Sequence, residues 1–282
     1  MKIHNTVDYF LANYSPSIQF LTQYHERYQE NFKEYFLYHC RNPHEKSKNA
    51  IYSYPSKMND IKESNEKIEK IISQIALTYE EKYHVLFTQD VHIIVGIYGS
   101  NAFTHRQIIP EITFCLEKLS SNEEHLKVII AHEFGHALHN ILSDKEGTDW
   151  TKIQWFHPYT TLFQEGCATY FSEQVVNATK STYFSYDDNG NDWLRFAEEN
   201  KSEIINAFME DVKIHTQAEV YHEWFSINGG SYYGFSRLAY FIGYNVIQYL
   251  IEKYKETKAV TLWKESTFFD EIEHALLSLQ SE

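Results

Sequence analysis

The sequence is poor in cysteine and has no long apolar run. Its 282 residues include only Cys40, Cys115 and Cys167, an odd number without CxxC spacing, which argues against a disulfide framework. No apolar run approaches the roughly 18 residues of a membrane span. The first residues show no apolar segment behind basic ones, so we expect no signal peptide. We therefore expect a protein of the reducing cytoplasm with no membrane partner.

Basic residues are also scarce. The chain has 25 Lys and Arg against 39 Asp and Glu, which gives a net charge of −14. A surface of this sign gives no electrostatic support for binding nucleic acid or an anionic membrane, so we expect neither as a partner. Composition leaves the oligomeric state open.

Glycine and proline, the residues that most often break helices, number only 10 and 5, while 43% of residues are hydrophobic. This composition indicates a well-packed and mainly helical chain. Apolar and aromatic residues recur at three-to-four spacing over residues 17–40 and 57–83, which predicts helices there. Residues 41–56 between them are polar and typical of turns.

The pattern changes after residue 83. Residues 84–100 form a β-branched run, and residues 110–119 alternate between apolar and polar positions, which is typical of a strand. The later residues have helical patterns joined by polar loops. We expect an α+β fold that is mostly helical, in which an N-terminal helical region (1–83) packs on a second region (84–282) with one small sheet and a helical C-terminal part.

Residues 132–136 read HEFGH, an HExxH motif. Roughly one chain in twelve of this composition would contain HExxH by accident, so its context has to decide. The polar and acidic residues 121–124 favour a helix start, and we expect the helix to reach about Leu142. A separate apolar stripe should hold it in the core: Ile130, Phe134, Ala137, Leu138 and Ile141.

On such a helix, His132 and His136 lie one turn apart on one face, where both can bind one metal ion. Glu133 lies beside them and can act as general base on a metal-bound water. His139 cannot join them, because three consecutive turns of one helix cannot converge on one ion. We expect His139 either at the helix surface or in contact with a metal ligand without binding the ion itself.

A catalytic zinc site needs a third protein ligand. Glu165 is the best candidate, because it lies off the apolar stripe of its own helical segment. Gly166 and Ala168 are small, so this helix can approach the HEFGH helix closely. Cys167 lies about 200° around the helix from Glu165, so both cannot bind one ion, and a buried structural cysteine is the commoner case.

HEFGH followed by QEGCATYF (164–171) resembles the gluzincin metallopeptidases, in which a Glu on a second helix completes the HExxH site. The EGxAxYF piece is similar to the aminopeptidase N branch. A fuller match, including residues 234–254, is to an uncharacterised group of predicted zinc-dependent proteases, over roughly the C-terminal two-thirds. The resemblance implies a zincin-like domain that cleaves peptides or proteins, with Zn²⁺ held by His132, His136 and Glu165 and with Glu133 as the base.

The chain also departs from these families. The 28 residues between the second histidine and the glutamate form an unusually long connection, and the GAMEN exopeptidase motif is absent. Thermolysin-like enzymes carry an Asp one turn after the third ligand, where this chain has Thr169; Glu173 can orient a histidine instead, or be an exposed helix residue. Leu142 stands where the metzincin pattern requires a third His.

Arg237, Tyr240 and Tyr244 fall at i, i+3 and i+7 and form one polar-aromatic stripe of a predicted helix. Peptide hydrolysis builds negative charge on the carbonyl oxygen, and a phenol or a cation directed there stabilises the transition state. The alternative is that both tyrosines are ordinary core residues.

Other segments have a functional and a structural interpretation. The strand at 110–119 can bind an extended peptide if it lies at an edge, or can be internal. The acidic loop 185–192 can bind Ca²⁺, but a solvated turn is favoured. His157, His215 and His222 can contact substrate, but structural roles are favoured.

The sequence therefore predicts a zinc metallopeptidase. One rival is a gluzincin-type protein that binds peptides without cutting them, and the presence of Glu133 argues against it. Another is a metal-free structural HEFGH helix, which the EGCATYF segment disfavours.

Overall fold

The computed structural model describes residues 1–281 and is mostly helical with one small sheet, which confirms the predicted α+β class. The chain divides into two compact units, Met1–Ala137 and Leu138 onward, and the boundary falls inside one long helix, α5 (Glu123–Lys145). The sequence pattern predicts a boundary between an N-terminal helical region (1–83) and a second region (84–282). In the structure, residues 1–83 belong to the same unit as the sheet.

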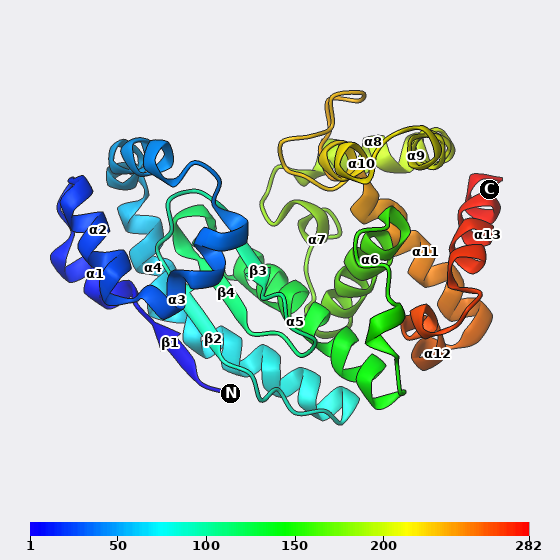
Figure 1. Cartoon of the computed structure of the whole chain (residues 1–282), viewed down its shortest axis with the longest axis horizontal. Coiled ribbons are helices and arrows are strands. Elements are labelled where there is room, and N and C mark those ends of the chain that lie inside the picture. The colour runs from blue at the N-terminus through cyan, green and yellow to red at the C-terminus, as the bar shows by residue number, and fades with distance from the viewer. Residues whose placement is uncertain (282) are drawn as a thin grey trace. The chain divides into compact units, whose positions relative to one another are not determined.

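The sheet has the order β1-β2-β4-β3 (Figure 1). Its strands are β1 (Ile3–Asn5), β2 (Val91–Ile94), β3 (Ala102–Thr104) and β4 (Ile112–Cys115). β1, β2 and β4 are parallel, and β3 runs antiparallel to β4. β4 is therefore internal, because β3 pairs with it on the side away from β2. Of the two interpretations of residues 110–119, the structure supports the internal strand and not the peptide-binding edge strand.

The helices of the first unit precede β2, apart from a 3-10 turn (Leu116–Lys118) after β4 and the first part of α5. They are α1 (Val7–Asn13), α2 (Ile18–Arg27), α3 (Gln29–Glu34), a π-helical turn (Tyr35–His39) and α4 (Pro43–Tyr83). Asn5 on one face of the sheet hydrogen-bonds through its side chain to Asn65 and Glu69 of α4. Strand alternation places Ile93 and Phe114 on the same face as Asn5, so the apolar face of the sheet is directed towards α4.

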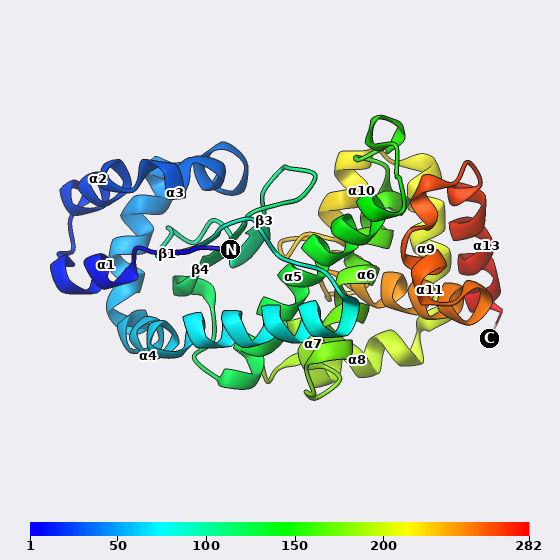
Figure 2. The ribbon, with the colours of Figure 1, turned by 90° about the horizontal axis from the view of Figure 1, so that it is seen from below.

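The stretch at 41–56, for which turns are predicted, is helical from Pro43 onward, which corrects that expectation. Pro43 is tolerated because it occupies the first turn of α4, where no N–H is needed. Pro55 lies inside the helix and cannot donate to the carbonyl of Ile51, four residues earlier. The hydroxyl of Tyr14 donates to that carbonyl instead, at 3.3 Å. α4 changes direction part-way along (Figure 2), as expected of a helix with an internal proline.

Buried side chains hold residues 95–99, which follow β2. Glu117 accepts hydrogen bonds from the backbone N–H groups of Gly96 and Tyr98, at 2.7 and 3.0 Å. The hydroxyl of Tyr35 accepts two more from this loop, both of 2.8 Å. Burial raises the pKa of Glu117 to about 7. Its carboxyl group is therefore a titratable group inside the first unit.

The second unit is helical in the part that the structure describes. Its elements are α6 (Pro158–Val175), α7 (Thr182–Ser185), α8 (Gly190–Glu199), α9 (Lys201–Ile214), α10 (Gln217–Trp224), α11 (Leu238–Tyr254), α12 (Glu256–Val260) and α13 (Phe268–Gln280), with 3-10 turns at Trp150–Lys152 and Leu262–Lys264. α6 and α11 lie side by side (Figures 1 and 2). A Cβ atom at Gly166 would overlap the backbone carbonyl of Gly243. We expected Gly166 to face the HEFGH helix, but its nearest neighbour is α11.

No helix within residues 1–281 combines the length and the apolar character that crossing a bilayer requires.

Candidate metal centre

The helix that carries HEFGH begins where local signals predict. The side chain of Asn122 accepts a hydrogen bond from the N–H of Glu124 at 2.9 Å, and its carbonyl accepts from Leu126 at 3.0 Å. Glu123 in the first turn pairs with Lys127. The Asn122 side chain thus gives a free N–H group of the first turn a hydrogen-bond partner, and the negative charge of Glu123 is favourable at the positive end of the helix dipole. α5 ends at Lys145, one turn beyond the expected end.

Burial fixes the HEFGH segment of α5 firmly. Phe134 is fully buried and meets the ring of Phe87 edge-on at 4.8 Å. The hydroxyl of Tyr79 donates to the carbonyl of Ala131 at 2.9 Å. The whole predicted apolar stripe is buried, but His125 and Asn140 are buried too. Burial is therefore not confined to one stripe, and the helix is embedded on most of its faces.

The two histidines of the motif lie close together. The rings of His132 and His136 are 4.8 Å apart between centroids and perpendicular. His132 is 3% exposed and His136 is half-buried, while Glu133 is 8% exposed. Polar groups removed from water in this way need a partner of matching chemistry.

Glu165 lies in the second turn of α6, and a histidine caps that helix. The Nδ1 atom of His157 accepts a hydrogen bond from the N–H of Tyr159 at 3.1 Å, and Pro158 occupies the first turn. His157 therefore has the structural role that the sequence interpretation favoured.

His132, His136 and Glu165 form one group of possible metal ligands, whose ligand atoms all lie within 4.8 Å of one another. Two imidazoles and one carboxylate are the ligand set of several catalytic zinc sites, in which the fourth position stays open. The chemistry of this donor set therefore fits a zinc ion.

His139 is fully buried, so of the two places expected for it the helix surface is wrong. Its Nε2–H donates to the carbonyl of Val260 at 2.7 Å, and its ring stacks on Trp263 at 4.1 Å. Cys167 is a buried free thiol, and burial raises its pKa well above the usual value, which disfavours the thiolate that binds metals. Neither residue belongs to the ligand group.

The structure separates the two candidate tyrosines of α11. The hydroxyl of Tyr244 donates to Glu173 and accepts from Gln248, both at 2.6 Å. Burial and, next, the negative charge of Glu165 raise the pKa of Tyr240 well above its usual value. Tyr240 is thus a protonated phenol within the electrostatic reach of Glu165.

Arg237 adopts a left-handed backbone conformation, with φ of 61°, directly before α11. Its guanidinium lies over the rings of Tyr186 and Tyr240, at 5.4 and 5.6 Å from their centroids. Arg237 and Tyr240 therefore form one cationic-aromatic cluster, and Tyr244 is bound elsewhere.

Glu173 and the acidic loop 185–192 have structural contacts in place of the metal-site roles considered for them. Glu173 receives the Tyr244 hydroxyl, so its assigned contact is a tyrosine and not a histidine. In the loop 185–192, Asp187 accepts from the N–H of Asn189 and Asp192 pairs with Arg195. That loop is not among the possible metal groups of residues 1–281.

Two further histidines lie at the ends of helices in the second unit. His215 ends α9 and lies 3.7 and 3.9 Å from the carboxylates of Asp211 and Glu219. His222 is exposed on α10. Neither belongs to a possible metal group.

The sequence interpretation missed a second possible metal group, His92, His105 and Glu111. These residues come from three neighbouring strand ends. Their separation along the chain hides them unless the strand register is known. The only local signals were a polar residue, His92, inside one β-branched segment and Glu111 near the start of the next strand-like segment.

No family model, curated protein or solved structure matches this chain.

Proposed function

We propose that the protein is a cytoplasmic, gluzincin-type zinc metallopeptidase with a zincin-like site. The observation that carries this proposal is the approach of three potential ligand atoms, from His132, His136 and Glu165, to within 4.8 Å of one another. HExxH supplies two of these ligands and a carboxylate beside them, which is the pattern that metal-assisted hydrolysis needs.

His132 and His136 on α5 and Glu165 on α6 would hold the ion. When bound, zinc supplies Lewis acidity, which polarises a carbonyl group and makes water a nucleophile near neutral pH. The burial of His132 and Glu133 strengthens the charge interactions within the site.

Glu133 takes the proton from the attacking water and then delivers it to the leaving amine. Its position in the sequence, directly after the first ligand, places it at the same turn of α5. Its low exposure favours proton transfer over simple solvation of the carboxylate.

Tyr240 is the better candidate for stabilising the negative charge on the substrate oxygen. Its pKa responds to Glu165, and it remains protonated and able to donate. Arg237 lies over its ring and adds positive charge to this cluster. The hydroxyl of Tyr244 already donates to Glu173, so it has no second proton to offer.

Glu133→Gln tests the function directly. We expect the variant to keep its zinc, because Glu133 is outside the ligand group, and to lose hydrolysis of a mixed peptide library by at least about 100-fold. Zinc content and cleavage are measured on the same preparation. Full activity would refute the mechanism, and wild-type protein that binds peptides but cleaves none would favour the non-cutting rival.

A further inference from the structure

Three side chains that can bind a metal ion, those of His92, His105 and Glu111, lie on one face of the sheet, opposite the face directed towards α4. His92 of β2 pairs in register with Thr113 of β4. Glu111 lies two residues before Thr113, so strand alternation places it on the same face. The backbone N–H of His105, just after β3, donates to the carbonyl of Glu111 at 2.8 Å. Two imidazoles and a carboxylate thus meet where β2, β3 and β4 adjoin.

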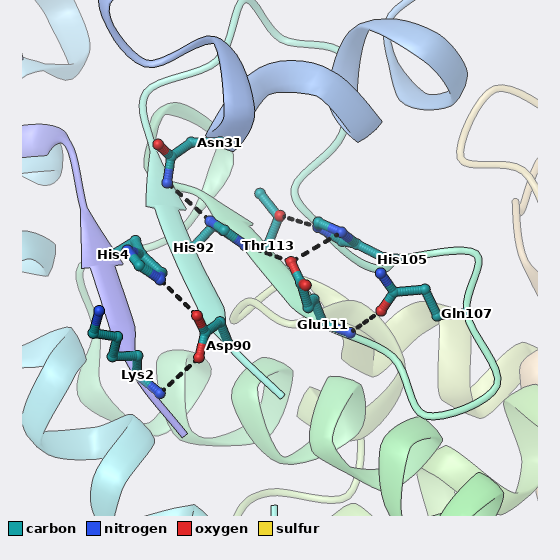
Figure 3. A network of polar contacts seen from close by, with 9 residues as sticks. All are labelled: Lys2, His4, Asn31, Asp90, His92, His105, Gln107, Glu111 and Thr113. Atoms are coloured by element: carbon teal, nitrogen blue, oxygen red, sulfur yellow. Dashed lines mark hydrogen bonds and ion pairs between the residues drawn. The ribbon is translucent and has the colours of Figure 1, made fainter. Parts of the chain in front are cut away.

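One carboxylate oxygen is the centre of the group (Figure 3). Oε2 of Glu111 is 2.7 Å from Nε2 of His92 and 3.6 Å from Nδ1 of His105. The imidazole rings are nearly parallel, with centroids 5.3 Å apart. The side chains of His92 and His105 are only 10% and 8% exposed. The two rings therefore present one nitrogen each to the same oxygen in a largely buried place.

The outer nitrogen of each ring is also held. Nε2 of His105 lies 2.7 Å from the hydroxyl of Thr113. Nδ1 of His92 lies 2.8 Å from the side-chain amide of Asn31 in α3, and an amide turned over by 180° accepts the Nδ1–H with its oxygen. Metal-binding histidines usually have their second nitrogen fixed in this way, because the bond sets the tautomer and the ring orientation.

We propose that His92, His105 and Glu111 form a second metal site, which binds a divalent transition-metal ion through Nε2, Nδ1 and a carboxylate oxygen. The three ligand atoms lie within 4.8 Å of one another. Ligand atoms at zinc distances of about 2.0–2.1 Å with tetrahedral angles are about 3.3 Å apart. The separations of the Glu111 oxygen from the two imidazole nitrogens, 2.7 Å and 3.6 Å, lie on either side of that value, so the carboxylate is close to the position that a shared ion requires.

A hydrogen-bonded network without an ion satisfies this cluster less well. The 2.7 Å contact is one good bond between His92 and Glu111. At 3.6 Å, however, Nδ1 of His105 is too far from the same carboxylate for a hydrogen bond. One cation at the centre engages all three side chains and offsets the charge of the carboxylate.

His4 on β1 is the natural control residue. It lies beside His92 in register and stacks on its ring at 5.2 Å. Its Nε2 is engaged by Asp90 at 2.7 Å, and it is not part of the ligand group. Since β2 and the β3–β4 hairpin both contribute ligands, the ion ties these strands together. Glu111 is 28% exposed, which leaves a side for a water molecule as fourth ligand.

Zinc stoichiometry tests the second site independently of the first. Full-length protein is stripped with a chelator, reloaded with Zn²⁺, desalted and analysed by mass spectrometry for bound metal. We expect two zinc ions per chain in the wild type, one in His92→Gln and in Glu111→Gln, and two in His4→Gln. Folded Glu111→Gln and His92→Gln proteins with undiminished zinc would overturn the proposal.

The failures of the two proposals are distinguishable. If the α5 site holds no zinc, Glu111→Gln changes the content from one ion to none, and the second site stands. If the Gln variants do not fold, the double variant His132→Ala/His136→Ala is titrated with Co²⁺. The second site predicts visible absorption bands at one equivalent of tetrahedral cobalt, and their absence refutes it.

Discussion

Gly166 of α6 and Gly243 of α11 bring the backbones of these helices into contact. A Cβ atom on Gly166 would overlap the carbonyl of Gly243, and one on Gly243 would overlap the carbonyl of Leu162. Glu165 precedes the first glycine, and Tyr240 lies one turn before the second. Because neither glycine has a side chain, α6, which carries Glu165, can approach α11, which carries Tyr240, this closely.

Gly166→Ala should destabilise the protein by about 1–3 kcal/mol, because the methyl group meets backbone that cannot turn aside. The free energy of unfolding is measured by urea titration. Gly147→Ala is the control: it has open space around it but a φ of 75°, so only a backbone cost of about 1 kcal/mol is expected. A destabilisation of Gly166→Ala well below about 1 kcal/mol would contradict the close contact.

Tyr240→Phe should impair catalysis, whereas Tyr244→Phe should impair stability. Tyr240→Phe is expected to lower kcat by at least about 10-fold with unchanged zinc, because it removes the donor to the developing oxyanion. Tyr244→Phe should leave kcat nearly unchanged and cost about 1 kcal/mol of stability, because Glu173 and Gln248 lose their shared partner. Steady-state hydrolysis and urea unfolding of both variants measure these effects. A large loss of kcat in Tyr244→Phe alone would reverse the assignment.

The buried Glu117 should make stability depend on pH. Its pKa is raised from 4.5 to about 7 in the folded state, so between these values the folded protein holds a proton that the unfolded chain has lost. The stabilisation from this proton is therefore fully present below about pH 4.5. The free energy of unfolding then falls as the pH rises to about 7, by up to about 1.4 kcal/mol per pH unit.

Glu117→Gln removes that titration, so its stability should fall less than that of the wild type between pH 5 and pH 7. At low pH the free energy of unfolding of the variant should also be lower than that of the wild type, because one amide oxygen replaces the two oxygens that accept from the N–H groups of Gly96 and Tyr98. Urea titrations at matched pH values give both quantities. Parallel pH profiles for the two proteins would show that Glu117 does not titrate in this range.

Local signals were sufficient for the helix of the site. Asn122 followed by two acids predicts the start of α5, and the i, i+4 spacing of His132 and His136 fixes their common face. These features depend only on residues within one or two helical turns, so the sequence alone contains them.

Features that depend on distant partners could not be predicted. Pro55 reads as a turn residue, and it is tolerated in α4 because Tyr14, far away in the sequence, supplies the missing donor. Tyr240 and Tyr244 look equivalent on one helical stripe until Glu173 is seen to bind the second. His92, His105 and Glu111 become one group only through the order and register of the strands.

The most direct test of the account is the zinc content of Glu165→Gln after challenge with a chelator, compared with the matched variant Glu173→Gln on the same helix. Glu173 binds Tyr244 and is outside the ligand group, so its variant should keep the zinc content of the wild type. Glu165→Gln should retain one zinc ion fewer per chain, with an affinity for that ion lowered by more than about 100-fold. Zinc content and affinity equal to the wild type in Glu165→Gln would contradict the proposed metal centre.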